Sequence, residues 1–169
     1  FCLSRGLGDV YKRQTSHAVR ALTLNPEQRK LLLEDIDARL PDAVEEFVRW
    51  ASPVMTFRRT TTREVELYDE LLPAGEKVVL FYHSGNRDER VFERPWEFDV
   101  SRNPNRHLGF GGGGPHYCMG ASLARTQLNA IFGEMLRVIP DIEAGEPELL
   151  RSGFIHGIKR MPCTFTARD

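Results

Sequence analysis

The stretch that decides the fold is His107–Gly120, HLGFGGGGPHYCMG, in which four consecutive glycines precede one cysteine. Apolar residues recur at helical spacing after it and predict a helix to about Arg137. They are Met119, Leu123, Leu128, Ile131, Phe132, Met135 and Leu136. Cys118 is therefore expected at a helix N-terminus, where unpaired N–H groups and the helix dipole favour a thiolate. Because glycine backbone can approach a flat ligand closely, a thiolate in this loop suits a metal.

Three other interpretations of this loop stay open. Gly109-x-Gly111-x-x-Gly114 matches the dinucleotide-binding fingerprint, and Glu134 follows at about the right distance of ~20 residues. The match is weak, because a glycine run satisfies any glycine pattern and residues 102–106 are no strand. The second interpretation is that the glycine run is a flexible linker, and the third is that Cys118 is an inert buried cysteine.

Composition narrows the class of protein. The chain has 169 residues, of which 41% are hydrophobic, and a formal charge of −1. This indicates one domain and gives no reason to expect a nucleic-acid or anionic-membrane partner. No apolar run approaches the roughly 18–20 residues that span a bilayer. Cys2, Cys118 and Cys163 are too widely spaced for a disulfide framework, which favours the reducing cytoplasm. The histidines lack the paired spacing of a zinc site.

The first fourteen residues differ in kind from the rest. The chain starts at Phe1, and Asp9–Gln14 resembles the in-frame translation of an adaptor used in sequencing libraries. We expect residues 1–14 to be a non-native leader and residues 15–169 to be part of one domain.

Three separated motifs carry a resemblance to a known family. Phe110–Gly120 resembles the haem-ligand signature of the cytochromes P-450: an aromatic residue, glycines, a basic residue two before the cysteine, then Cys-x-Gly. The loop is one residue longer than usual, as in some bacterial members. Glu46-Phe47-Val48-Arg49 is similar to the family's Glu-x-x-Arg pair, and Phe98–Arg102 to the meander that supplies a second arginine.

The resemblance implies roles for particular residues. Cys118 would be the axial ligand of haem b, a ligand type that pushes electron density towards O–O cleavage. Arg59 and His116 would bind the propionates, and the loop residues Phe110, Gly111, Gly113 and Gly120 would complete the haem site. Glu46, Arg49 and Arg102 would form a buried structural network. Val54, Met55, Phe154 and Ile155 are candidate substrate contacts, although simple hairpin packing explains them equally well.

The implied fold is mainly α with a small β-sheet region, as in the C-terminal part of the P-450 fold. The family's elements would be the end of the distal helix, the Glu-x-x-Arg helix, a β region, the meander, the cysteine loop, the proximal helix and a hairpin. Local patterns predict three helices before residue 51: one ending near Leu22, one from Pro26 that stops before Pro41, and a short one over 41–50. After them, the patterns predict strands within 54–82, an irregular stretch over 84–106 and a hairpin over 151–166. Residues 77–82 are expected to be a buried strand and Pro73-Ala74-Gly75 a turn. Asn25 is expected to cap the helix at Pro26, with Gln28 completing a capping box.

The implied activity is that of a soluble bacterial haem-thiolate monooxygenase. It would insert one oxygen atom of O2 into a C–H bond, with electrons from NAD(P)H delivered by a ferredoxin-type partner. The glycine loop and Phe154–Lys159 are similar to actinobacterial enzymes that hydroxylate sterol side chains and methyl-branched lipids. The family's acid–alcohol pair is not within the sequence, so the chain by itself is expected to be inactive, and the whole protein to be a monomer. A haem-thiolate module without turnover is the alternative, and a dinucleotide-binding domain a remote one.

Overall fold

The computed structural model describes residues 3–166, with side chains from residue 13 onward. The helices are α1 (Leu3–Leu24), α2 (Pro26–Glu34), α3 (Ile36–Ala51), α4 (Tyr82–Gly85) and α5 (Ala121–Val138). The strands are β1 (Thr56–Thr60), β2 (Val65–Leu67), β3 (Glu70–Leu72), β4 (Lys77–Phe81), β5 (Glu143–Ala144), β6 (Glu148–Leu149), β7 (Ile158–Arg160) and β8 (Cys163–Thr164). The expected mainly α fold with small β elements is confirmed.

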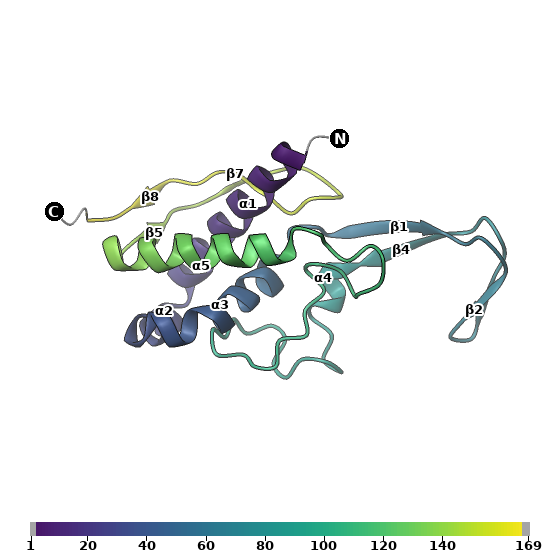
Figure 1. The fold of residues 1–169 in the computed structure, drawn as a ribbon, viewed down its shortest axis with the longest axis horizontal. Coiled ribbons are helices and arrows are strands. Elements are labelled where there is room, and N and C mark those ends of the chain that lie inside the picture. The colour runs from purple at the N-terminus through teal and green to yellow at the C-terminus, as the bar shows by residue number, and fades with distance from the viewer. Residues whose placement is uncertain (1–2, 167–169) are drawn as a thin grey trace.

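Helices α1, α3 and α5 pack together and form the core (Figure 1). Phe47 of α3 lies at its centre, with its ring 4.7 Å from that of Phe132 on α5 and 6.1 Å from that of Phe98. The completely or almost completely buried apolar side chains include Ala18, Leu22, Leu32, Val44, Phe47, Val48, Leu128, Phe132 and Leu136. In the described residues no helix is long and apolar enough to cross a membrane.

All strand pairing in the described residues is antiparallel and two-stranded, in the pairs β1–β4, β2–β3, β5–β8 and β6–β7. Figure 1 shows β1 and β4 projecting from the helices as an arm that ends in β2 and β3, while the C-terminal strands run beside α1. The predicted turn at Pro73-Ala74-Gly75 is confirmed, and Gly75 has φ +87°, which suits glycine. The hairpin predicted over 151–166 is only partly correct: β7 pairs with β6, which precedes that range, and β8 pairs with β5 because the chain returns alongside the segment that follows α5.

The predicted boundary between the second and third helices is wrong. The break falls at Asp35, whose side chain accepts a hydrogen bond from the Ala38 N–H (3.0 Å), and Pro41 lies inside α3. A proline just past the first turn removes only one intrahelical bond, and the Asp35 cap provides the helix start instead. Asn25 does occupy the N-cap position of α2, but the capping box does not form. The Gln28 side chain instead accepts a hydrogen bond from the Val100 N–H (2.9 Å).

Two expectations of burial are also wrong. Strand β4 is largely exposed, with Phe81 62% exposed, because the β1–β4 arm extends away from the helical core. On α5 the small residues Ala121 and Ala124 are buried, whereas Met119 precedes the helix and is exposed, and Leu123 is exposed. The face of α5 that packs into the core at its start is therefore formed by these two alanines.

Helix α1 continues from Leu3 through the stretch expected to be a leader, so these residues form part of the fold described here. Their origin stays a prediction, and the side chains of residues 1–12 lie outside the described part. Gln14 is fully buried, and neither its Oε1 nor its Nε2 has a hydrogen-bond partner. A buried amide without partners is costly, so Gln14 weakens the packing of α1.

Candidate functional site

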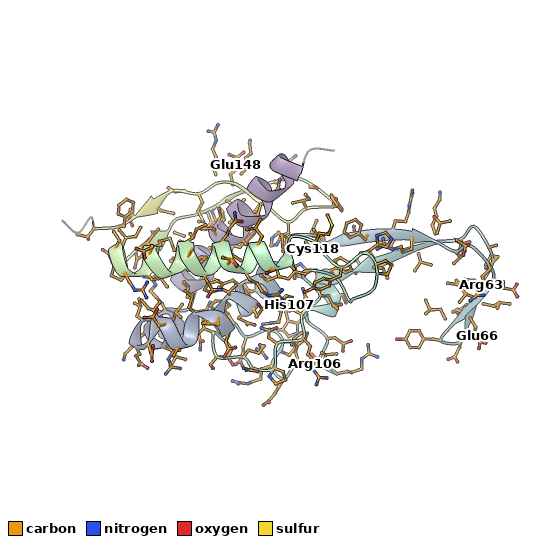
Figure 2. The ribbon with its side chains drawn as sticks, in the orientation of Figure 1. Arg63, Glu66, Arg106, His107, Cys118 and Glu148 are labelled. Atoms are coloured by element: carbon orange, nitrogen blue, oxygen red, sulfur yellow. The ribbon has the colours of Figure 1, made fainter. Side chains whose placement is uncertain are left out.

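The cysteine loop is held by its own backbone. The Cys118 N–H donates to the Phe110 carbonyl (2.9 Å), and the Gly111 N–H donates to the Leu108 carbonyl (2.9 Å). Gly120 is the N-cap of α5, so the half-buried, free thiol of Cys118 lies just before the first turn of that helix (Figure 2). This placement agrees with the position expected for Cys118 at a helix N-terminus.

Glycine is required at several places in this loop. Gly111, Gly113 and Gly114 have φ of +98°, +97° and +77°, a region that other residues enter only with strain. A Cβ atom at Gly109 would collide with the Val48 side chain, since the loop lies directly against α3. At Gly113, by contrast, no atom lies within 4 Å of the Cβ position. The loop is therefore anchored on one side and bare on the other.

A hollow of about 430 Å³ lies between this loop and the β1–β4 arm. Its apolar lining comes from the side chains of Leu80, Phe81 and Leu108, together with the backbone of the glycines. Arg59 from β1 and His116 from the loop border the same hollow. The structure thus brings together the two residues predicted to bind propionates.

These residues suit haem. A soft thiolate is an established iron ligand, and two basic side chains beside an apolar hollow suit a flat apolar group that carries carboxylates. The bare glycine face at Gly113 leaves space for a ring system to approach the backbone. In the part of the chain that the structure describes, no group of three or more His, Cys, Asp or Glu is arranged to hold a metal ion by itself.

Glu46 and Arg49 form a fully buried ion pair with two hydrogen bonds of 2.7 Å each. Arg102 completes the group, with its Nε 3.3 Å from Glu46 Oε2. Arg49 also donates to the carbonyls of Asn86 and Pro95 (2.8 Å each). The three residues predicted as a network are therefore in contact, and they join α3 to the irregular stretch.

Asn86 is a structural residue that the sequence did not single out. It is completely buried, and its Nδ2 donates to Ser52 Oγ (2.8 Å). Its Oδ1 accepts from the Leu108 N–H (2.6 Å), so one side chain joins the end of α3 to the start of the cysteine loop. The polar stretch Asn86-Arg87-Asp88 was visible in the sequence, but nothing in it indicated a buried amide.

A second unpredicted group joins α3, α5 and the loop. Glu45 accepts from Arg125 Nη2 (2.8 Å) and lies 2.9 Å from His107 Nε2. Because His107 Nδ1 accepts from the Gly109 N–H, the ring proton is on Nε2 and points to Glu45. Burial acts to raise the pKa of Glu45, but the hydrogen bonds from Arg125 and His107 outweigh it and lower the pKa to about 2. Arg125 also lies over the Phe110 ring at 4.6 Å.

The four candidate substrate contacts lie together. Val54 and Ile155 form an isolated antiparallel bridge, and the Met55 N–H donates to the Phe154 carbonyl (2.9 Å). The Phe154 ring packs edge-on against Phe57 at 5.4 Å. This contact also fits hairpin packing, so their role stays a prediction.

The glycine stretch lacks the setting of a dinucleotide site. Residues 86–120 contain no helix or strand, whereas the fingerprint requires a strand immediately before the glycines. Nor is it a flexible linker, because hydrogen bonds within its own backbone hold its shape and His107 Nε2 lies 2.9 Å from Glu45 of α3.

Comparisons with known proteins agree with this geometry. The chain matches the family model described as Cytochrome P-450 over residues 38–138, which include the Glu46 network and Cys118. It is 53% identical over 159 residues to a methyl-branched lipid omega-hydroxylase of Mycobacterium tuberculosis, covering 94% of this chain and 37% of that relative. It is 42% identical over 159 residues to a steroid C26-monooxygenase of Mycolicibacterium smegmatis, covering 94% of this chain and 36% of that relative.

A solved structure shows the same arrangement. A cytochrome P-450 of Mycobacterium marinum in complex with pseudoionone matches with a TM-score of 0.89 and 57% identity, over 90% of this chain and 37% of that one. The fold and the cysteine loop define part of a haem-binding domain of the P-450 type. The chain belongs to the cytochrome P-450 family, and it spans 37% of the length of the methyl-branched lipid omega-hydroxylase.

Proposed function

We propose that this chain is the haem-ligating part of a monooxygenase, with Cys118 as the axial ligand. The observation that carries the proposal is that Arg59 and His116 border the hollow beside the loop that holds this free thiol. Bound haem would supply the activation of O2 for insertion of one oxygen atom into a C–H bond.

The chain's own residues would then bind and orient the cofactor. The hydrogen bond from the Cys118 N–H to the Phe110 carbonyl and the start of α5 would fix the position of Cys118 as the ligand. Arg59 and His116 would pair with the two haem carboxylates and fix the orientation of the ring. Leu80, Phe81 and Leu108 would exclude water from its edge. Glu46, Arg49 and Arg102 would support the loop without taking part in chemistry.

The substrate class that we propose is a methyl-branched lipid or a sterol side chain. The relatives named above act on a methyl-branched lipid and on a steroid. The candidate contacts Val54, Met55, Phe154 and Ile155 are apolar, which suits such substrates. A full-length homologue should give a spectral shift with sterols or branched fatty acids, and the absence of a shift would count against this class.

The remaining proposals concern the whole protein. We propose a monomer in the reducing cytoplasm that receives electrons from NAD(P)H through a ferredoxin-type partner. In the described residues the cysteines Cys118 and Cys163 are both free, which supports a reducing compartment. We also propose that this chain by itself is not a competent monooxygenase, since it spans only 37% of its relative's length.

The test is the absorption spectrum of the haem-reconstituted chain, reduced and exposed to carbon monoxide. A red-shifted Soret band in the wild type, but not in Cys118→Ala, is the expected result. Haem binding without this signature would overturn the assignment of Cys118. A haem-thiolate module without turnover would give the same spectrum, so product formation by the full-length enzyme separates the two functions.

A further inference from the structure

A second hollow, lined by basic side chains, lies beside Trp50 near the C-terminal end of α3. It has a volume of about 180 Å³ and lies between α1, α4 and the C-terminal strands. Its polar lining consists of His17, Arg20, Trp50, His83, Arg87 and His156, and no carboxylate lines it. Three histidines and two arginines from three separate stretches of sequence therefore face one small space.

His17 provides a buried ring nitrogen without a partner. The residue is 8% exposed, and its Nε2 is buried with no hydrogen bond. Its ring centroid lies 4.3 Å from that of His156, whose Nδ1 is 2.8 Å from the Ala51 carbonyl. Because a carbonyl only accepts, His156 Nδ1 carries the ring proton. Burial lowers the pKa of His17 to about 4, and His156 and Arg20 add to this, against a smaller opposing contribution from the His156 backbone.

Arg87 adds a positive charge, and no carboxylate of the described residues is in direct contact with it. It is 8% exposed, and its terminal nitrogens donate to the carbonyls of Arg49 (3.2 Å) and Trp50 (2.9 Å). Among the described residues it makes no ion pair. Burial, and then the charge of Arg49, lower its pKa to about 10, although Glu46 opposes this. The hollow therefore has an excess of positive potential.

We propose that this hollow binds a small oxyanion, a carboxylate or a phosphate, through His17 and Arg20 with Arg87 supplying charge. A bound anion would accept a hydrogen bond from His17 Nε2 once the ring is protonated, and would offset the local positive charge. Arg20 is at the rim, where its other charged neighbour is the exposed Glu146 at 4.0 Å. The site uses residues of this chain alone and does not depend on the proposed haem function.

The experiment follows the ring nitrogens of His17 by NMR in the haem-free chain at low ionic strength, while inorganic phosphate or octanoate is added. Because an anion stabilises the protonated imidazole, the pKa of His17 should rise from about 4 as the site fills. Saturation by phosphate alone would identify free phosphate as the ligand, and saturation by octanoate alone an acyl carboxylate. No change with either anion, as expected if only water fills the hollow, would overturn the proposal.

Two charge-matched variants test the position of the site. Arg20→Gln should weaken binding about tenfold, as expected for loss of one hydrogen bond to a charged group. Arg63→Gln removes the same charge from the end of the β arm, far from α1 in Figure 2, and should leave the affinity unchanged. Equal weakening by both variants would show that only the net charge matters, and would overturn the proposed site.

Discussion

Replacing Glu46 with glutamine removes one charge from the buried network while keeping the shape of the side chain. In the wild type, its two oxygens accept from Arg49, from the Asp99 N–H (2.9 Å) and from Asn105 Nδ2 (2.9 Å). Arg102 Nε lies 3.3 Å away. A neutral amide would leave two buried guanidinium groups without a counter-charge, and its NH2 group would face donors.

The expected cost follows from this burial. Glu46 and Arg49 are both completely buried, and breaking such a pair by removing one partner costs about 3–5 kcal/mol. For a chain of this size, the thermal midpoint of unfolding falls by about 2–4 °C for each kcal/mol of lost unfolding free energy. Glu46→Gln should therefore lower the midpoint by roughly 6–20 °C.

The assay is urea unfolding followed by circular dichroism. Glu97→Gln is the matched control, since Glu97 and Arg94 form an exposed pair with the same sequence spacing and a distance of 2.9 Å. Exposed pairs contribute about 0–1 kcal/mol, so the control should unfold almost like the wild type. The reasoning is refuted if Glu46→Gln costs less than about 1 kcal/mol, or if the control costs as much.

Three further predictions concern other parts of the chain. Because the pKa of Glu45 is lowered to about 2, its ionised form stabilises the fold above its ordinary pKa of 4.5, and this stability is lost as the pH falls from 4.5 to 2. Arg125→Gln should flatten the dependence of the unfolding free energy on pH in that window, and an unchanged slope would contradict the assignment. Gln14→Leu should stabilise the chain by about 1–3 kcal/mol in urea unfolding, because it removes a buried amide without partners; destabilisation would show that the amide is satisfied. Arg59→Ala in a full-length parent should weaken haem retention during gel filtration, and unchanged haem occupancy would remove its assignment to a propionate.

The sequence could predict the features whose causes lie within a few residues. Helical periodicity after Cys118 indicated α5, because backbone hydrogen bonds in a helix join residues four apart. Pro73-Ala74-Gly75 indicated a turn, since proline fixes φ and glycine accepts a positive φ. The spacing of Glu46 and Arg49 placed both on one helix face, where they pair.

Predictions that depended on the competition between local signals were less successful. Pro41 indicated a helix end, but the Asp35 cap supplied a better start, so the proline is accommodated inside α3. Gln28 had the spacing of a capping box, but its side chain instead accepts a hydrogen bond from the Val100 N–H, which lies in a segment distant in sequence. The apolar residues of β4 indicated a buried strand, yet burial depends on what packs against the strand.

By itself, then, the sequence determined the succession of the longer helices α1, α2, α3 and α5, the loop that carries Cys118 and, through three motifs, the family. Only the tertiary structure decided that Glu45 pairs with Arg125 while its neighbour Glu46 pairs with Arg49, because adjacent helical side chains point in different directions. It also brought together the histidines of the basic hollow, which are distant in sequence. Such contacts depend on how whole segments pack, and no local pattern of residues specifies that packing.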